Sequence, residues 1–119
     1  MYVVVVEYQR VKKDILWDYS WRPTGSSKII YRTHSLQEAE RVFKETMKKY
    51  KKKGYKNCFL VSESLVTPSM RAEGIVKFYM CRERFGLFKK EVKGVYIVLK
   101  ETRKNHILYT RKKRKKRRN

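Results

Sequence analysis

Only one stretch of this sequence has the spacing of an amphipathic helix, and segments rich in β-branched and aromatic residues lie on both sides of it. The stretch begins at Ser35-Leu-Gln-Glu38, a capping box in which the Ser35 hydroxyl accepts from the Glu38 amide and the Glu38 carboxylate reaches back to the Ser35 amide. Gly54 follows as a helix-ending residue. The apolar side chains that share one face are Leu36, Ala39, Val42, Phe43, Met47 and Tyr50. The sequence therefore predicts one helix over residues 36–53.

The other apolar segments favour strands, because Val, Ile, Tyr, Phe and Trp fit a pleated surface. Pro and Gly punctuate them: Arg22-Pro-Thr-Gly-Ser-Ser predicts a turn between two strands, and the segment 66–74 predicts a loop. The segment 85–91 separates two strands that can pair as an antiparallel hairpin. The predicted strands cover residues 2–11, 15–21, 28–33, 55–64, 75–84, 92–102 and, as a short final strand, 107–110.

Strands that do not alternate with helices indicate the α+β class. We expect a single domain with a curved antiparallel sheet of about five to seven strands and one amphipathic helix (about 36–53) packed on one face. The chain of 119 residues suffices for one core and divides into a compact body, residues 1–110, and a basic extension, residues 111–119. No apolar run of about 18 residues occurs, so neither a membrane span nor a signal peptide is expected.

The most unusual quantity is the charge, which is +21 with 32 Lys and Arg against 11 Asp and Glu. Eight of these positive charges form one run without an acid: Arg111, Lys112, Lys113, Arg114, Lys115, Lys116, Arg117 and Arg118. Subtracting the 8 from +21 leaves +13 on residues 1–110, so the body is basic as well. Such a chain repels itself unless a polyanion neutralises it, and the run is expected to be disordered unless bound. Nucleic acid is the first candidate partner.

Cationic side chains interleaved with aromatic rings strengthen this interpretation, since cations neutralise phosphates and exposed rings stack on unpaired bases. In the strand 75–84 we expect Val76, Phe78 and Met80 to face the core, with Lys77, Tyr79 and Cys81 on the opposite face. Besides the run 111–118, the predicted nucleic-acid-binding residues are Lys48, Lys49, Lys51, Lys52, Lys53, Lys77, Tyr79, Arg82, Arg84, Lys89 and Lys90.

Catalytic and metal-binding patterns are weak. His34, His106, Cys58 and Cys81 lack the close pairs that organise zinc, so we expect no metal and no cofactor. We read the two cysteines as small core side chains in a reduced protein rather than as a disulfide framework. Glu91-Val-Lys93 resembles the Glu-x-Lys core of restriction-type nucleases, which would need a further carboxylate such as Glu7 or Glu63.

We therefore expect a non-catalytic nucleic-acid-binding protein, with RNA in a ribonucleoprotein favoured over DNA and with no membrane or small-molecule partner. Its build, a compact α+β body with a basic extension, resembles ribosomal proteins in architecture alone. A small metal-dependent nuclease or replication protein of a virus or mobile element, and a viral-type inhibitor that docks on an acidic protein, remain alternatives. We expect a cytoplasmic location, or a nuclear one in a eukaryote, and the low amide content is typical of thermophile proteins.

Overall fold

A computed structural model describes residues 1–13 and 19–102 of the chain. The predicted final strand 107–110 and the basic run 111–118 lie outside these residues. The described elements, in chain order, are β1 (Tyr2–Lys13), β2 (Tyr19–Thr33), α1 (Leu36–Lys52), β3 (Asn57–Val61), the 3₁₀ turn η1 (Glu63–Leu65), α2 (Pro68–Ala72), β4 (Ile75–Arg82) and β5 (Glu91–Glu101).

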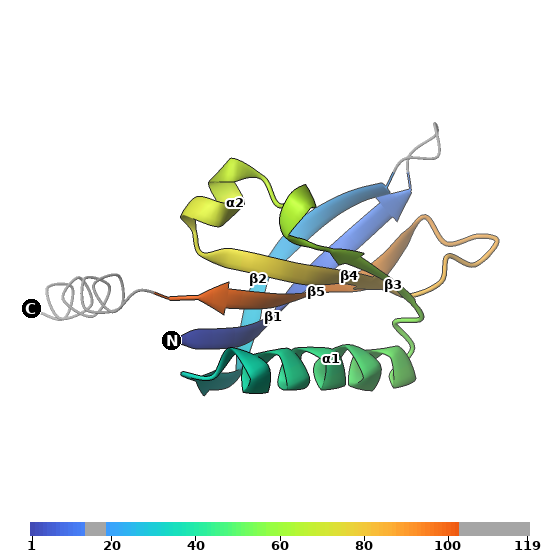
Figure 1. Ribbon diagram of the computed structural model, residues 1–119. Helices are drawn as coiled ribbons and strands as arrows, with labels where there is room; N and C mark the ends of the chain where they lie inside the picture. The colour runs from blue at the N-terminus through green and yellow to red at the C-terminus, as the bar shows by residue number, and fades with distance from the viewer. Residues whose placement is uncertain (14–18, 103–119) are drawn as a thin grey trace, which may run out of the picture.

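The strands form one antiparallel five-stranded sheet in the spatial order β2-β1-β5-β4-β3 (Figure 1). The chain is thus a single compact α+β domain. β5 lies at the centre, between β1 and β4, and carries the most continuous run of buried side chains. The sheet is long on the side of β1 and β2 and short at β3, which has only 5 residues.

Each face of the sheet has its own hydrophobic cluster. On one face, Phe43 and Ala39 of α1 pack with Val4, Ile97 and Leu99. On the other, Val66, next to η1, packs with Phe78 and Val98, and Met70 of α2 joins them. Figure 1 shows α1 on one side of the sheet, with η1 and α2 on the other. The sheet is therefore covered on both faces, by a long helix on one and by short elements on the other.

Because both faces of the sheet are covered, the side chains of β4 are buried on both faces and not on one face as expected. Phe78 and Met80, which we expected to face the core, pack in the cluster on the side of η1 and α2, and Val76 packs in the cluster under α1. Tyr79 also faces α1, where its ring stacks on Phe43 with centroids 4.7 Å apart, and Cys81 is fully buried in the same cluster. Both faces of this strand therefore carry core residues, and the expectation that Tyr79 and Cys81 lie on a face away from the core is wrong.

The predicted turn at residues 22–27 is wrong, because β2 runs through it as one strand of 15 residues. Between the pairs Glu7↔Ser27 and Gln9↔Pro23 the register shifts, which places a bulge around Thr24 and Gly25. Gly25 has φ 87°, and the Thr24 hydroxyl donates to the Tyr8 carbonyl oxygen at 3.1 Å. Pro23 is tolerated because β2 is an edge strand, where a missing N–H costs little. The same residues that favour turns also favour bulges.

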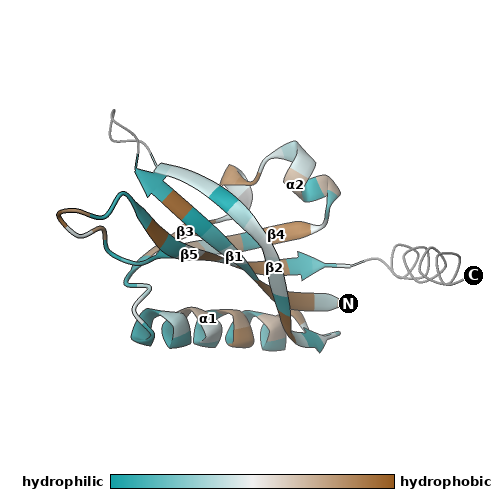
Figure 2. Cartoon of the chain, turned by 180° about the vertical axis from the view of Figure 1, so that it is seen from behind, coloured by the Kyte–Doolittle hydropathy of each residue, from teal (hydrophilic) through white to brown (hydrophobic). Residues whose placement is uncertain are grey.

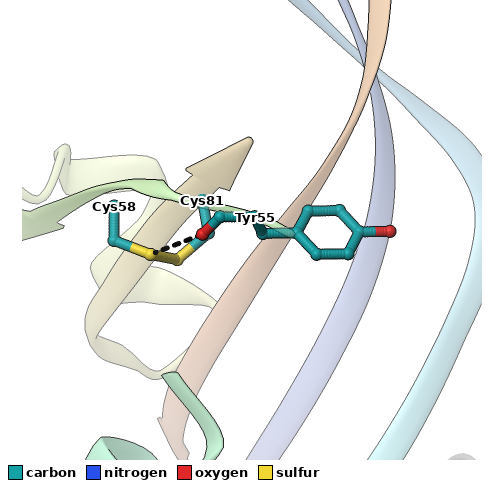
Figure 3. The surroundings of a disulfide bond; sticks show 3 residues. All are labelled: Tyr55, Cys58 and Cys81. Carbon is teal, nitrogen blue, oxygen red and sulfur yellow. Dashed lines mark hydrogen bonds between the residues drawn. A yellow bond between two sulfur atoms is a disulfide. The ribbon is translucent and has the colours of Figure 1, made fainter. Parts of the chain in front are cut away.

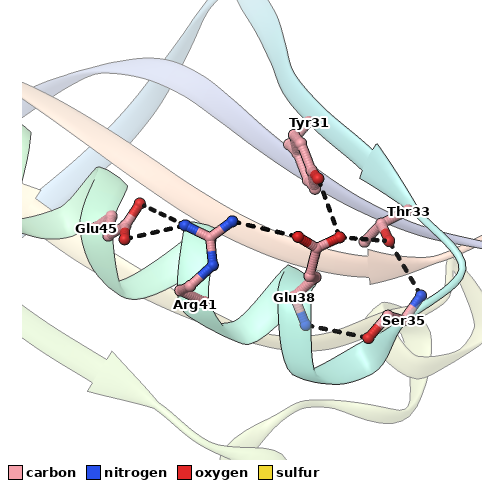
Figure 4. Close-up of polar contacts among 6 residues, drawn as sticks. All are labelled: Tyr31, Thr33, Ser35, Glu38, Arg41 and Glu45. Carbon is pink, nitrogen blue, oxygen red and sulfur yellow. Dashed lines mark hydrogen bonds and ion pairs between the residues drawn. The ribbon is translucent and has the colours of Figure 1, made fainter.

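The start of α1 follows the predicted cap in one half only (Figure 4). The Glu38 amide donates to the Ser35 hydroxyl at 3.3 Å, as in a capping box. The Glu38 carboxylate, however, accepts from the Tyr31 hydroxyl at 3.1 Å and pairs with Arg41 at 3.4 Å, while the Ser35 amide donates to Thr33 Oγ1. The carboxylate thereby ties the end of β2 to the first turn of α1.

The structure corrects the expectation that the cysteines are unpaired, because Cys58 and Cys81 form a disulfide (Figure 3). They lie directly opposite each other on β3 and β4, with Cα atoms 4.1 Å apart. The two cysteines are 23 residues apart in sequence, so the sequence alone did not indicate that they lie close together. The pairing of β3 with β4 brings them together.

One further difference concerns a local element. The predicted loop 66–74 contains the short helix α2, which begins after Thr67, whose hydroxyl accepts from the Met70 amide at 3.3 Å. Within residues 1–13 and 19–102, none of the helices has the length and apolar character that crossing a bilayer requires.

Candidate nucleic-acid interface

Cationic side chains gather at one end of the molecule. There the last turns of α1, the start of β3, the end of β4 and the loop from β4 to β5 come together, at the end opposite the N-terminus (Figure 1). We call this surface the basic end and define it by Lys48, Lys49, Lys51, Lys52, Lys53, Lys56, Arg82, Arg84, Lys89 and Lys90. Arg10, Arg41 and Lys77, which form ion pairs with glutamates, lie outside this set.

Most of the predicted site residues that the structure describes belong to this surface. The lysines of α1, together with Arg84, Lys89 and Lys90, are exposed, and Arg82 is half-buried. Two predicted residues lie elsewhere, on the face that α1 covers. Lys77 Nζ pairs with Glu40 Oε1 at 3.2 Å and lies 5.7 Å from the ring centre of Phe43, while Tyr79 stacks on that same ring. The residues 111–118 fall outside the described part of the chain.

A groove opens at the basic end, with a volume of about 500 Å³. Its lining combines aromatic, cationic and amide side chains and contains no acid. The lining residues are Tyr19, Trp21, Lys51, Lys56, Asn57, Cys58, Phe59, Met80 and Arg82. This volume lies in the range of ordinary ligand pockets.

Arg82 is held in place by two rings at the mouth of this groove. Its guanidinium carbon lies 4.5 Å from the ring centre of Tyr19 and 5.0 Å from that of Phe85. The two rings stack with centroids 5.5 Å apart, and Arg82 Nη1 donates to the carbonyl oxygen of Glu83 at 3.1 Å. A guanidinium fixed by rings keeps most of its donors available for a carboxylate or phosphate.

The aromatic walls differ in how much of their surface is accessible. Trp21 stacks on Tyr96 with centroids 5.3 Å apart, which fixes its ring over β5. Phe59, on the edge strand β3, is 60% exposed, and Tyr19 is 44% exposed. The loop from β4 to β5 carries two further apolar side chains at its hydrophobic tip (Figure 2), Leu87 at 98% and Phe88 at 95% exposure. This end therefore offers apolar ring faces as well as positive charge.

The sequence reasoning missed three of these residues as site candidates: Lys56, Asn57 and Phe59. One signal could have located Phe59. In antiparallel strands, residues directly opposite share a face, and Phe59 pairs with Met80, two positions from Arg82. Without knowledge of the register between β3 and β4, however, the sequence gives no reason to prefer Phe59 over Leu60.

Buried tyrosines lie behind the basic end. Tyr50 of α1 is hydrogen-bonded to Tyr8 through their hydroxyls at 3.0 Å, and Lys53 Nζ lies 4.9 Å from the ring centre of Tyr50. Burial, supported by this hydrogen bond, raises the pKa of Tyr50 above its ordinary value. Burial likewise raises the pKa of Tyr55 and of Tyr96. These hydroxyls stay neutral near pH 7 and add no negative charge beneath the lysines.

The candidate nuclease residues whose side chains are described, Glu91, Lys93 and Glu7, do not share one face of the sheet. Glu91 and Lys93 alternate on β5 and so share one face, and Glu91 Oε1 lies 3.9 Å from Arg10 Nε. Glu7 lies opposite Tyr96 on β1, which puts its side chain on the other face of the sheet. No three His, Cys, Asp or Glu side chains of the described ranges come close enough together to hold a metal ion. Of Glu63, the remaining candidate, only the backbone in η1 is described.

Comparison with protein-family models, with curated proteins and with solved structures gave no match for this chain.

Proposed function

We propose that this chain is a non-catalytic nucleic-acid-binding protein, with RNA favoured over DNA, and that the basic end is its main phosphate-binding surface. The observation that carries the proposal is the gathering of lysines and arginines from the end of α1, the turn before β3, the end of β4 and the loop before β5 on one end of a folded body. Cations that neutralise phosphates release condensed counterions, which provides affinity without sequence information.

In this proposal the helix has two roles. Its apolar face covers one side of the sheet, while its last turns supply Lys48, Lys49, Lys51, Lys52 and Lys53 to the basic end. Lysines at a helix C-terminus are also favoured by the helix dipole, so their position is compatible with a stable fold. The basic extension 111–119 adds a second phosphate-binding segment that becomes ordered along the backbone of the nucleic acid.

Substitution of three exposed lysines of α1 tests the role of the basic end. The triple variant Lys48→Gln, Lys49→Gln and Lys52→Gln keeps helix-compatible side chains but removes three charges. If each lysine contacts one phosphate of a single strand, the slope of log affinity against log salt falls by about 0.7 per lysine, or about 2 in all. Fluorescence anisotropy with a labelled 20-nucleotide RNA between 50 and 200 mM salt measures that slope.

A matched control removes the same charge from exposed positions elsewhere: Lys28→Gln, Arg32→Gln and Lys44→Gln. We expect the control to bind RNA with nearly the wild-type slope. Equal loss in both triple variants would show that net charge acts without a defined surface. Failure of the wild-type chain to bind either RNA or DNA at low salt would overturn the proposed function. RNA cleavage that requires Mg²⁺ and is lost in Glu91→Ala would establish the nuclease alternative instead.

A further inference from the structure

The aromatic groove at the basic end has features that phosphate binding alone does not require. A surface that only neutralises a backbone needs cations, whereas this groove places the exposed rings of Phe59 and Tyr19 among them. A phenylalanine that is 60% exposed on an edge strand contributes little to the core. Its ring face is available to a ligand.

The cations of the groove are arranged around these rings. Lys51 and Lys56 are exposed and line the groove, Lys51 from the end of α1 and Lys56 from the residue just before β3. Arg82 lines it from β4 and is held by its contacts with Tyr19 and Phe85. A ligand that fits this lining has a flat apolar face next to a negatively charged group.

An unpaired nucleotide has this combination, because its base presents a free π-face and its phosphate carries the charge. In a duplex the base faces are covered by their stacked neighbours, so no π-face is free to stack on a ring of the protein. An acidic peptide supplies the charge but no comparable series of flat faces. Charge complementarity and exposed rings together therefore favour a single strand.

Building on the proposed function, we propose that this groove binds an unpaired segment of RNA, with a base against the ring of Phe59 and its phosphates at Lys51, Lys56 and Arg82. Trp21 forms the floor, since its stacking on Tyr96 holds it in place. Asn57 places an amide in the same lining, which can donate to and accept from a base edge. The protein thus distinguishes single strands from duplexes through the groove and binds both through the rest of the basic end.

The test compares Phe59→Ala with Leu60→Ala, the neighbouring residue of β3, which is 42% exposed and points to the opposite face. The probes are a fluorescein-labelled 12-nucleotide oligouridine and a 12-base-pair RNA duplex at the same salt concentration. Loss of one stacked base, about 1–3 kcal/mol, corresponds to a decrease in affinity of about 5- to 150-fold at 1.4 kcal/mol per tenfold. We expect this decrease for Phe59→Ala with the single strand only, and unchanged duplex affinity and melting temperature. Phe59→Tyr keeps the ring and is expected to retain binding.

The possible results separate this inference from the proposed function. If Phe59→Ala binds oligouridine as well as Leu60→Ala and the wild type, the groove does not hold a base, although the chain still binds RNA. If Phe59→Ala weakens the binding of oligouridine, of the duplex and of competing polyglutamate equally, the groove recognises negative charge rather than a base. That result overturns the inference. If the wild type binds no RNA, the proposed function itself has failed.

Discussion

Arg82 shows how much of the site depends on the position of single side chains. It comes from the last residue of β4, yet it contacts Tyr19 at the start of β2 and Phe85 in the loop before β5. The sequence marked Arg82 as one cation among many. The structure distinguishes it from the flexible lysines, because its guanidinium is oriented before any ligand arrives and loses less freedom on binding.

Gly94 is the residue whose lack of a side chain allows Trp21 to lie over β5. A Cβ at this position would come 2.7 Å from Trp21 Cζ3, 2.6 Å from Val11 Cγ2 and 3.3 Å from the Cys81 carbonyl oxygen. We expect Gly94→Ala to lower the free energy of unfolding by about 1–3 kcal/mol through overpacking. Because Trp21 must shift, its fluorescence spectrum should also change.

Gly86→Ala is the matched control for this prediction. Near Gly86 only Lys89 Cγ comes within 4 Å of an added Cβ, at 3.9 Å. Urea denaturation of the two variants and the wild type measures the difference. A Gly94→Ala variant as stable as Gly86→Ala would mean that Trp21 is not packed as described.

The buried pair of Tyr8 and Tyr50 predicts a loss of stability in alkaline solution. The pKa of Tyr50 is raised above its ordinary value of 10.0 in the folded chain, so above pH 10 the unfolded chain gives up the phenolic proton first. The folded state then holds more protons than the unfolded state, and the free energy of unfolding falls as pH rises, by at most about 1.4 kcal/mol per pH unit for one tyrosine. Below pH 10 this contribution is fully present and constant.

Tyr50→Phe isolates this contribution, because phenylalanine retains the ring but has no proton to lose. We expect the variant to be less stable at pH 8, owing to the lost hydrogen bond, but to lose less stability than the wild type between pH 10 and pH 11.5. Denaturation curves at several pH values determine both slopes. Parallel slopes would show that Tyr50 titrates as an exposed tyrosine does.

At the scale of elements, the sequence predicted the elements that are specified by residues close together in the chain, such as a helix cap. The Ser35 hydroxyl caps α1, which begins at Leu36, and the hairpin of β4 and β5 follows the expected order. The bulge in β2 and the pairing of β3 could not be predicted in this way. Both depend on contacts with a neighbouring strand, of Thr24 with Tyr8 and of Cys58 with Cys81. The register between two strands cannot be determined from a single sequence.

The disulfide stabilises the weakest part of the sheet. β3 has 5 residues and a single neighbouring strand, β4, to which Cys58 is bonded through Cys81. A cross-link between residues 23 positions apart is worth about 3 kcal/mol by restriction of the unfolded chain. We therefore expect dithiothreitol to lower the melting temperature of the wild type. Since β3 carries Phe59, reduction should also weaken binding of single-stranded RNA.

Cys58→Ser provides the control, because it removes the cross-link at a half-buried position while Cys81 stays in the core. The variant should melt at the temperature of the reduced wild type and should not respond to dithiothreitol. A wild type whose melting temperature is insensitive to the reductant would show that the cross-link contributes no stability.

At the scale of the whole molecule, the charge led us to expect a polyanionic partner, and the fold determines which cations lie together. Cations from four separate segments, 48–53, 56, 82–84 and 89–90, meet because antiparallel pairing brings the end of β4 and the starts of β3 and β5 to one end of the sheet. Lys77 and Tyr79 lie within the same sequence region but point toward α1. Composition therefore could not distinguish a cation of the basic end from one that, like Lys77, lies under α1.

The position of β5 has a consequence for how the protein is made. Among the described strands, the one that joins the β1–β2 pair to the β3–β4 pair is synthesised last, so the earlier segments emerge as two strand pairs and a helix without a shared centre. Assembly must wait until synthesis has passed residue 101. Nascent chains that stall before that point would expose Val4, Val6 and Phe43 to chaperones or to aggregation.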